Sequence, residues 1–418
     1  MSSKNPSNRR AAITACIFLI AVCGPAAAQD DTPLQSVRDR PRPSYDPLGI
    51  QMGIWEISAG LDIGVEYSDN VLAASSGEVD DILTVLDPAV GIAADWGRSS
   101  LALTAGMSIG RYRDFSSEDY DDFAINLRGL QRIGAEGRLR IGLRSSGGHD
   151  TRRDPTDEDG LQPNKYAIEA KSTGYAGRVG AVDLDLDLEA KNIDYEDTPG
   201  LNFLINNDDR DRRENRFIAR FGLLAEQAIS TFLEYQQDER RYDQPLDDSG
   251  VARSSEGSAI GVGIRLQPSG KLNGEVMLGQ VERRYQSSQF SDNQRFWVRS
   301  ALEWNPTGLT TVSLDYETRI EETTSSSTAG VEVDEIGLRV DHELLRNVVI
   351  SLERRTSNEV YVAATRKDDI ARWFGSVEYL ASNRLRISFE IAANDRNSSA
   401  SSQSFAENVY RLTLRTAL

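Results

Sequence analysis

The sequence predicts an all-β fold, a transmembrane antiparallel β-barrel of about 18 strands with short periplasmic turns and long extracellular loops. Three observations lead to this prediction. Apolar and polar residues alternate along most of the chain, short and long connections alternate between these segments, and the chain begins with a segment typical of exported proteins.

The first 28 residues have the layout of a secretory signal peptide. Basic residues precede an apolar stretch over 11–22, and small residues follow it, as at a cleavage site. This stretch is too short to span a bilayer as a helix. Both cysteines, Cys16 and Cys23, lie in this segment. The mature chain is therefore predicted to lack cysteine, which excludes disulfides and thiolate chemistry.

The composition alone would suit an acidic soluble protein. The 418 residues include 47 Lys+Arg and 65 Asp+Glu, a formal net charge of −18, and only 39 % are hydrophobic. These values exclude a bundle of transmembrane helices, which needs several apolar runs of about 20 residues. They also argue against nucleic-acid binding, which needs a basic face. Removal of the predicted signal peptide leaves 44 basic and 65 acidic residues, a net charge of −21.

From Glu56 onward the chain shows the period-two pattern of strands that have one apolar face. In the first such segment, Ile57, Ala59 and Leu61 alternate with polar residues or glycine. No amphipathic helix pattern interrupts the series. The pattern recurs in the segments 101–109, 182–189, 217–223, 260–266, 312–316 and 385–391.

The connections between these segments alternate in length. Short turns such as Gly134–Gly137 alternate with long polar loops such as Asp150–Asn164, and the chain has eight of the former and nine of the latter. This count predicts about 18 antiparallel strands with both termini on the side of the short turns. Propellers and sandwiches also alternate apolar and polar residues, but their loops are not systematically short at one end and long at the other.

Aromatic residues gather near the segment ends, where a membrane barrel carries two interfacial girdles. Strand propensity explains part of this distribution as well. The residues expected in the girdle at the short-turn end are Trp55, Trp96, Trp304 and Tyr379. Those expected in the outer girdle are Tyr67, Tyr112, Tyr166, Tyr195 and Tyr285.

The start of the predicted barrel carries motifs of a known family. The segment Ser44–Ile50 is followed by Gly53, the first strand and Tyr67–Val71, and the hairpin Ala94–Arg98 comes after Asp87-Pro88. In these motifs, and in its strand pattern over residues 44–418, the chain resembles the Putative beta-barrel porin 2 family of outer-membrane proteins. The resemblance implies a barrel without a catalytic motif and a link to exopolysaccharide or capsule synthesis and export.

These patterns divide the chain into three parts. We predict a signal peptide over 1–28, a periplasmic N-terminal lead over 29–52 and an outer-membrane barrel over 53–418. Its first part, Gln29–Pro43, is rich in proline and charge, so we expect it to be flexible, and a segment that docks to a partner is the alternative.

If the apolar residues face lipid, the alternate residues face the lumen. This second face carries charges of both signs. The charges either neutralise one another across neighbouring strands or bias a polar conduit toward particular solutes. The candidate lumen-lining residues are Arg138, Arg140, Arg144, Asp183, Asp185, Asp187, Glu189, Arg216, Arg220, Arg299, Asp315, Arg319, Arg339, Glu353, Arg355, Arg386 and Glu390.

A catalytic barrel is the main alternative to a conduit, and the sequence does not favour it. The two histidines, His149 and His342, are placed by the strand count at opposite ends of the barrel, and no Gly-x-Ser-x-Gly motif is present. His149 and Asp150 are adjacent, so their side chains should point to opposite faces. The acidic loop Asp154–Gly160 lacks the ligand spacing of an EF-hand. We expect neither an enzyme nor a bound cofactor or metal.

The sequence therefore predicts a channel-like protein of the bacterial outer membrane that works by passive passage, and the family resemblance implies that it serves surface polysaccharide export. A general diffusion porin for small solutes and a plugged structural or adhesive barrel are the alternatives. The expected partners are outer-membrane lipid and lipopolysaccharide, the outer-membrane assembly machinery and components of polysaccharide export, with no role for nucleic acid.

Overall fold

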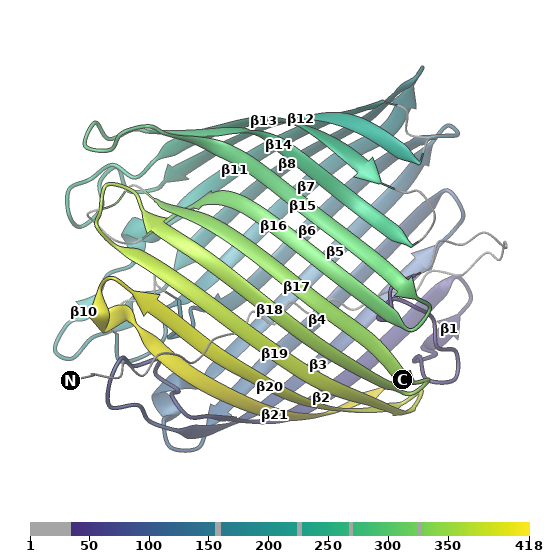
Figure 1. Cartoon of the computed structure of the whole chain (residues 1–418), viewed down its shortest axis with the longest axis horizontal. Coiled ribbons are helices and arrows are strands. Elements are labelled where there is room, and N and C mark those ends of the chain that lie inside the picture. Colours follow the sequence, from purple (N-terminus) through teal and green to yellow (C-terminus); the bar gives the residue numbers. More distant parts are fainter. Residues whose placement is uncertain (1–34, 155–159, 224–227, 267–270, 324–327, 329) are drawn as a thin grey trace, which may run out of the picture.

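The fold is a closed antiparallel barrel of 18 strands, as the sequence predicts. The computed structural model describes residues 35–154, 160–223, 228–266, 271–323, 328 and 330–418. Each barrel strand pairs with its neighbours along the chain, and β21 closes the wall by pairing with β2 (Figure 1). Within these ranges no helix is long and apolar enough to cross a membrane.

The barrel strands are 12 to 16 residues long. They are β2 (Trp55–Ser68), β3 (Asp81–Asp95), β4 (Ser99–Tyr112), β5 (Tyr120–Ile133), β6 (Gly137–His149), β7 (Lys165–Val179), β8 (Val182–Tyr195), β11 (Arg212–Leu223), β12 (Ile229–Tyr242), β13 (Ser255–Leu266), β14 (Leu272–Tyr285), β15 (Asn293–Thr307), β16 (Thr310–Glu321), β17 (Val331–Leu345), β18 (Val348–Tyr361), β19 (Lys367–Ser382), β20 (Leu385–Ser398) and β21 (Phe405–Ala417). Eight short turns and nine longer loops connect them.

The remaining elements are short. β1 (Ile50–Met52) forms a hairpin with the start of β2, and β9 (Thr198–Pro199) pairs with β10 (Leu204–Ile205) inside one outer loop. Three single 3₁₀ turns lie in outer loops, η1 (Ser116–Glu118), η2 (Asp208–Arg210) and η3 (Ser401–Gln403).

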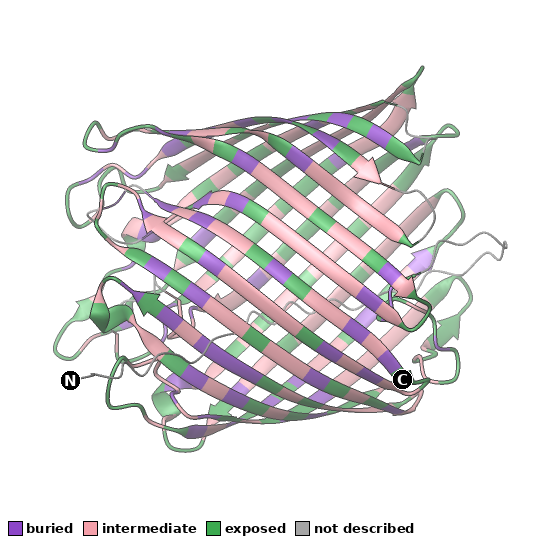
Figure 2. Ribbon diagram, in the orientation of Figure 1, coloured by how far each residue is buried: buried purple, intermediate pink, exposed green. Residues whose placement is uncertain are grey.

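Alternation along each strand separates an apolar face from a polar face (Figure 2). On β2, Ile63 and Val65 are 40 % and 49 % exposed, whereas Asp62 is 7 % exposed. A closed wall leaves no unpaired strand edge, so the backbone needs no water where the wall meets hydrocarbon. The apolar residues therefore form the outer, lipid-facing surface, and the polar residues face inward.

The girdle predicted at the short-turn end is confirmed, and the outer girdle is wrong for four of its five tyrosines. Trp55, Trp96, Trp304 and Tyr379 are all exposed. Tyr67 is also exposed on the apolar face, but the register places the other four tyrosines on the polar face. There they pack beneath the outer loops, as where the Arg210 guanidinium lies 3.8 Å from the centre of the Tyr195 ring.

Candidate functional site: the charged interior of the barrel

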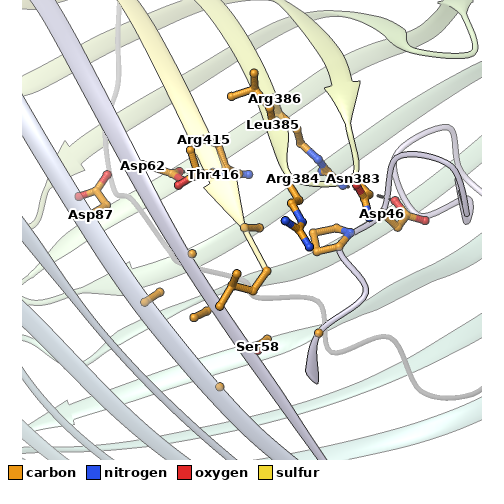
Figure 3. A pocket seen from close by; sticks show the side chains of 18 of the residues that line it. Asp46, Ser58, Asp62, Asp87, Asn383, Arg384, Leu385, Arg386, Arg415 and Thr416 are labelled. Atoms are coloured by element: carbon orange, nitrogen blue, oxygen red, sulfur yellow. Dashed lines mark hydrogen bonds and ion pairs between the residues drawn. The ribbon is translucent and has the colours of Figure 1, made fainter. Parts of the chain in front are cut away.

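A cavity of about 710 Å³ lies inside the barrel near the end of the short turns (Figure 3). Inner residues of β2, β3, β20 and β21 line it on one side, and residues 38–49 of the lead line it on the other. Arg415 of β21 lies 2.9 Å from a carboxylate oxygen of Asp62, and Arg386 lies 3.4 Å from Asp46 of the lead. Glu390 also lines the cavity. Its walls therefore carry both signs of charge.

The part of the lead that the structure describes is docked and not free, so the expected flexibility is wrong for residues 35–43. Val37 is fully buried, and its backbone N–H donates to Thr311 Oγ1 at 2.8 Å. The Arg42 guanidinium lies 3.2 Å from the buried carboxylate of Glu343. These contacts satisfy the polar groups of the lead, and it crosses the mouth from β16–β18 toward the cavity.

The loop that follows β6 reaches across the outer end of the barrel. Arg153 forms a bidentate ion pair with Glu407 of β21, at 2.5 and 2.6 Å, and four strands separate β6 from β21 in the wall. Glu407 is 1 % exposed and also accepts a hydrogen bond from Ser68. Arg396 donates to the Arg153 carbonyl oxygen at 2.7 Å. The described part of the loop thus crosses the interior at the outer ends of β2–β5 and narrows the outer mouth.

Two of the four predicted acidic residues of β8 pair with an arginine two strands away. Arg140 of β6 pairs with Asp185 and, at 3.0 Å, with Asp187. Asp183 pairs with Arg178 across the β7–β8 turn at 2.8 Å. Mutual neutralisation, one of the two alternatives left open by the sequence, therefore holds for this part of the wall.

A second network spans β11–β15. Glu234 is almost fully buried and receives Arg220 at 2.8 Å and Arg299 at 2.7 Å. Arg220 also pairs with Glu275 at 2.9 Å, and its guanidinium lies 4.3 Å from the centre of the Phe232 ring. Phe232 belongs to a small apolar cluster on the inner face. This part of the wall is packed as well as paired.

A third network spans β16–β18. Arg355 lies 2.7 Å from Asp315, and Arg339 lies 3.4 Å from Glu353. Arg319 pairs at 2.5 Å with the glutamate two residues further along its own strand. All five predicted residues of these strands are therefore paired.

Three ion pairs that join alternate strands pass directly over a glycine of the strand between them. A Cβ atom at such a glycine would lie within 3.0 Å of both charged partners, so only glycine leaves room for the pair. The three sets in direct register are Arg140–Gly174–Asp187, Arg283–Gly257–Asp238 and Arg355–Gly337–Asp315.

Five predicted residues are not brought into any ion pair with the described part of the chain. They are Arg138 and Arg144 of β6, Glu189 of β8 and Arg216 of β11, which are exposed, and Glu390 of β20, which is half-buried. Glu189 and Arg216 are cross-strand neighbours in the register, yet their charged groups remain apart. Contact of these side chains with a permeating solute stays a prediction.

The two histidines lie at opposite ends of the barrel and share no site. His149 Nδ1 is 3.0 Å from the Asp122 carboxylate, and its ring stacks on Tyr120 with the ring centres 4.3 Å apart. His342 Nδ1 is 3.0 Å from Thr310 Oγ1. Asp150 pairs with Arg210 and not with the adjacent histidine.

Several carboxyl groups of the outer loops have shifted pKa values, among them Asp150 and Asp247. Burial raises the pKa of Asp150, although Arg210 lies 2.9 Å away and acts in the opposite direction. Burial would also raise the pKa of Asp247, but the Val251 backbone N–H and the Arg253 guanidinium hold it below its ordinary value. No group of three or more His, Cys, Asp or Glu residues suited to a metal occurs among the described residues. The loop positions 155–159 lie outside them.

The sequence reasoning missed several charged residues of the inner face. Asp62, Asp87, Arg411 and Arg415 line the cavity from β2, β3 and β21. Each alternates with apolar neighbours in the same way as the predicted residues, so the period-two pattern contained the signal. The ion pairs that pass over a glycine could not be predicted in this way, because they depend on the register of three strands.

The family model of the Putative beta-barrel porin 2 family matches residues 42–418. No curated protein shows significant similarity. Similar solved structures include the outer membrane protein opdK from Pseudomonas aeruginosa (13 % identity, 87 % of this chain and 99 % of that chain covered, TM-score 0.47). They also include a BenF-like porin from Pseudomonas fluorescens Pf-5 (10 %, 87 % and 99 %, 0.48) and the siderophore receptor PirA from Acinetobacter baumannii (9 %, 86 % and 80 %, 0.45). Because its family model covers the barrel and part of the lead, the chain belongs to the Putative beta-barrel porin 2 family and is a porin-like outer-membrane β-barrel.

Proposed function

We propose that the protein is a passive channel for polar solutes across the outer membrane. The observation that carries this proposal is the exposure of charged residues inside the closed wall. Arg140, Asp185 and Asp187 keep side-chain exposures of 38 %, 43 % and 48 % although they are paired with one another. A barrel of 18 strands is too wide to be filled by its own side chains, so this space is available to water and solute.

In this proposal the channel discriminates between solutes by charge and catalyses no reaction. Solutes pass the cavity beside the lead, the charged wall and the mouth narrowed by the β6–β7 loop. Charged side chains along such a path favour or disfavour permeant ions according to their sign. The histidines, one against an aspartate and one against a threonine, are placed for structure and not for hydrolysis.

Planar-bilayer recording of the refolded protein tests the proposal. We expect discrete conductance steps that grow with salt concentration. Folding of the same sample is checked by its faster gel mobility without heating, as for other membrane barrels. A folded sample without conductance at any voltage would contradict the channel and favour the plugged structural or adhesive barrel.

We further propose surface polysaccharide export as the physiological use of the channel, and the family resemblance supports it. Partners would then include lipopolysaccharide on the outer face and export components at the periplasmic face. A strain lacking this chain should lose surface polysaccharide and regain it when the gene is restored. Normal polysaccharide in the deletion strain, together with slower uptake of small solutes, would favour a general diffusion porin.

A further inference from the structure

Four inward arginines on two neighbouring strands form a continuous basic surface, which we call the arginine track. It consists of Arg128 and Arg132 of β5 and Arg138 and Arg144 of β6. These two strands lie side by side in the wall (Figure 1). In the register Arg132 lies directly opposite Arg138, while Arg128 and Arg144 lie opposite Gly142 and Asn126. All four side chains are exposed, and none pairs with an acidic residue in the described ranges.

Stability does not account for this arrangement. Like charges directly opposite each other on neighbouring strands are destabilising, and Arg132 and Arg138 are such a pair. Other arginines of the inner face are neutralised, such as Arg220 and Arg355. On β8, Asp185 and Asp187 are already engaged by Arg140, and Glu189 forms no ion pair with a residue of the track. The positive charge of the track is therefore not neutralised by ion pairs within the described part of the chain.

The neighbours of the track are small, so its guanidinium groups reach open space. Ala102 of β4 lies opposite Arg128, and Ala170 of β7 lies opposite Arg144. From Arg138 to Arg144 the strand advances by roughly 20 Å. The track thus begins beside the short turn after β5 and follows more than half of an apolar band that is about 25 Å tall.

We propose that the arginine track binds an acidic oligosaccharide, a chain of sugars that carries several carboxylates, as it moves through the barrel. Guanidinium groups bind carboxylates with two parallel hydrogen bonds. Several spaced cations favour a ligand with several anions over a single one, because each further contact is intramolecular. This inference rests on the proposed channel function and names its substrate class.

Isothermal titration of the full mature chain in detergent tests the track, with trigalacturonate as the probe. Galacturonate serves as the single-carboxylate probe and maltotriose as the neutral one. The track variants are Arg132→Gln with Arg138→Gln, and Arg128→Gln with Arg144→Gln. The matched control is Arg213→Gln with Arg241→Gln, which removes the same charge from two exposed arginines that share the apolar face of β11 and β12.

We expect trigalacturonate to bind more tightly than galacturonate, and maltotriose not to bind. Each track variant should lose roughly tenfold in affinity or more, the size of one charge-assisted contact, while the control stays unchanged. Added salt should weaken binding, because the track is exposed.

Two results would overturn the track, namely no binding of trigalacturonate to the wild type, or an equal loss in the control. Conductance of the same preparations keeps this question apart from the channel proposal. Binding without conductance would leave the track in place and contradict the channel, whereas conductance without binding would contradict the track alone.

Discussion

At the residue scale, the interior is organised by ion pairs that cross over glycines. Arg355 and Asp315 belong to strands two apart, and Gly337 lies between them in the register. A Cβ atom at Gly337 would approach the Asp315 carboxylate to 2.6 Å and the Arg355 guanidinium to 2.8 Å. Gly337 of β17 therefore leaves room for a salt bridge that links β16 to β18 across the strand between them.

Gly337→Ala should therefore weaken the barrel, because the new methyl group displaces one or both charged partners. We expect a loss of about 1–3 kcal/mol in the free energy of unfolding, measured by urea titration in detergent. Gly375→Ala is the matched control, since a Cβ atom added to this strand glycine would have no other atom within 4 Å. Equal stability of both variants would show that the pair is not needed.

Asp247 provides a pH dependence in the outer loop between β12 and β13. Its carboxylate accepts the backbone N–H groups of Ser249 and Val251 at 2.9 and 2.8 Å. The pKa of Asp247 is lowered in the fold, from an ordinary value of 3.8. The carboxylate therefore stabilises the loop above that ordinary value, and this stabilisation is lost as the pH falls through the lowered pKa.

Hydrogen exchange should reveal this loss at the two amides. We expect protection of Ser249 and Val251 at pH 6 and its loss at the acid end of the titration. Asp247→Asn should lower the protection at pH 6 as well, because an amide oxygen is a weaker acceptor. If pH does not change the exchange protection of these amides in the wild type, the Asp247 carboxylate is not the group that stabilises the loop.

At the element scale, strand pattern and strand number could be predicted because both follow from local periodicity. The fold of the loops could not. The length of the β6–β7 loop is visible in the sequence, but its inward course depends on Arg153 meeting Glu407, 254 residues away. For the outer tyrosines the face could have been predicted, because the alternation already puts Tyr112 and Tyr195 on the polar face. The space that they fill could not, because loops from elsewhere in the chain create it.

Arg153→Ala should release the β6–β7 loop and widen the outer mouth. Within the described part of the chain, its bidentate pair with Glu407 joins this loop to β21. We expect a larger single-channel conductance in planar bilayers. Arg152→Ala is the control, because Arg152 pairs with Glu118 of the nearby β4–β5 loop and does not reach β21. An unchanged conductance in Arg153→Ala would mean that the loop does not limit flow.

At the scale of the whole molecule, the barrel is restricted at both ends by parts of its own chain. The β6–β7 loop narrows the outer mouth, and the lead fills part of the inner one. The wall and the polarity of its two faces could be predicted, because the alternation within each single strand contains that information. The sequence did not predict the docked lead, since Val37 is one of few apolar residues in a polar segment, and only the assembled mouth supplies its buried site.

The lead should act as an inner plug, and the absence of other cysteines from the predicted mature chain makes this testable. The Val37 backbone N–H lies 2.8 Å from Thr311 Oγ1, so the two Cα atoms lie within about 7 Å, near the upper end of the disulfide range. Val37→Cys with Thr311→Cys should cross-link under oxidation and hold conductance low at all voltages. Reduction should let the conductance rise, whereas Val37→Cys alone should not respond to oxidant.

Removal of residues 29–46 gives the complementary result. This truncation deletes Val37, Arg42 and Asp46 together, and with them the contacts to β16, β17 and β20. The barrel strands begin only at Trp55, so the wall itself should still close. We expect a conductance higher than that of the reduced double-cysteine variant, in a sample whose gel mobility shows that it is folded. A folded truncation with wild-type conductance would show that the lead is docked at the mouth without obstructing it.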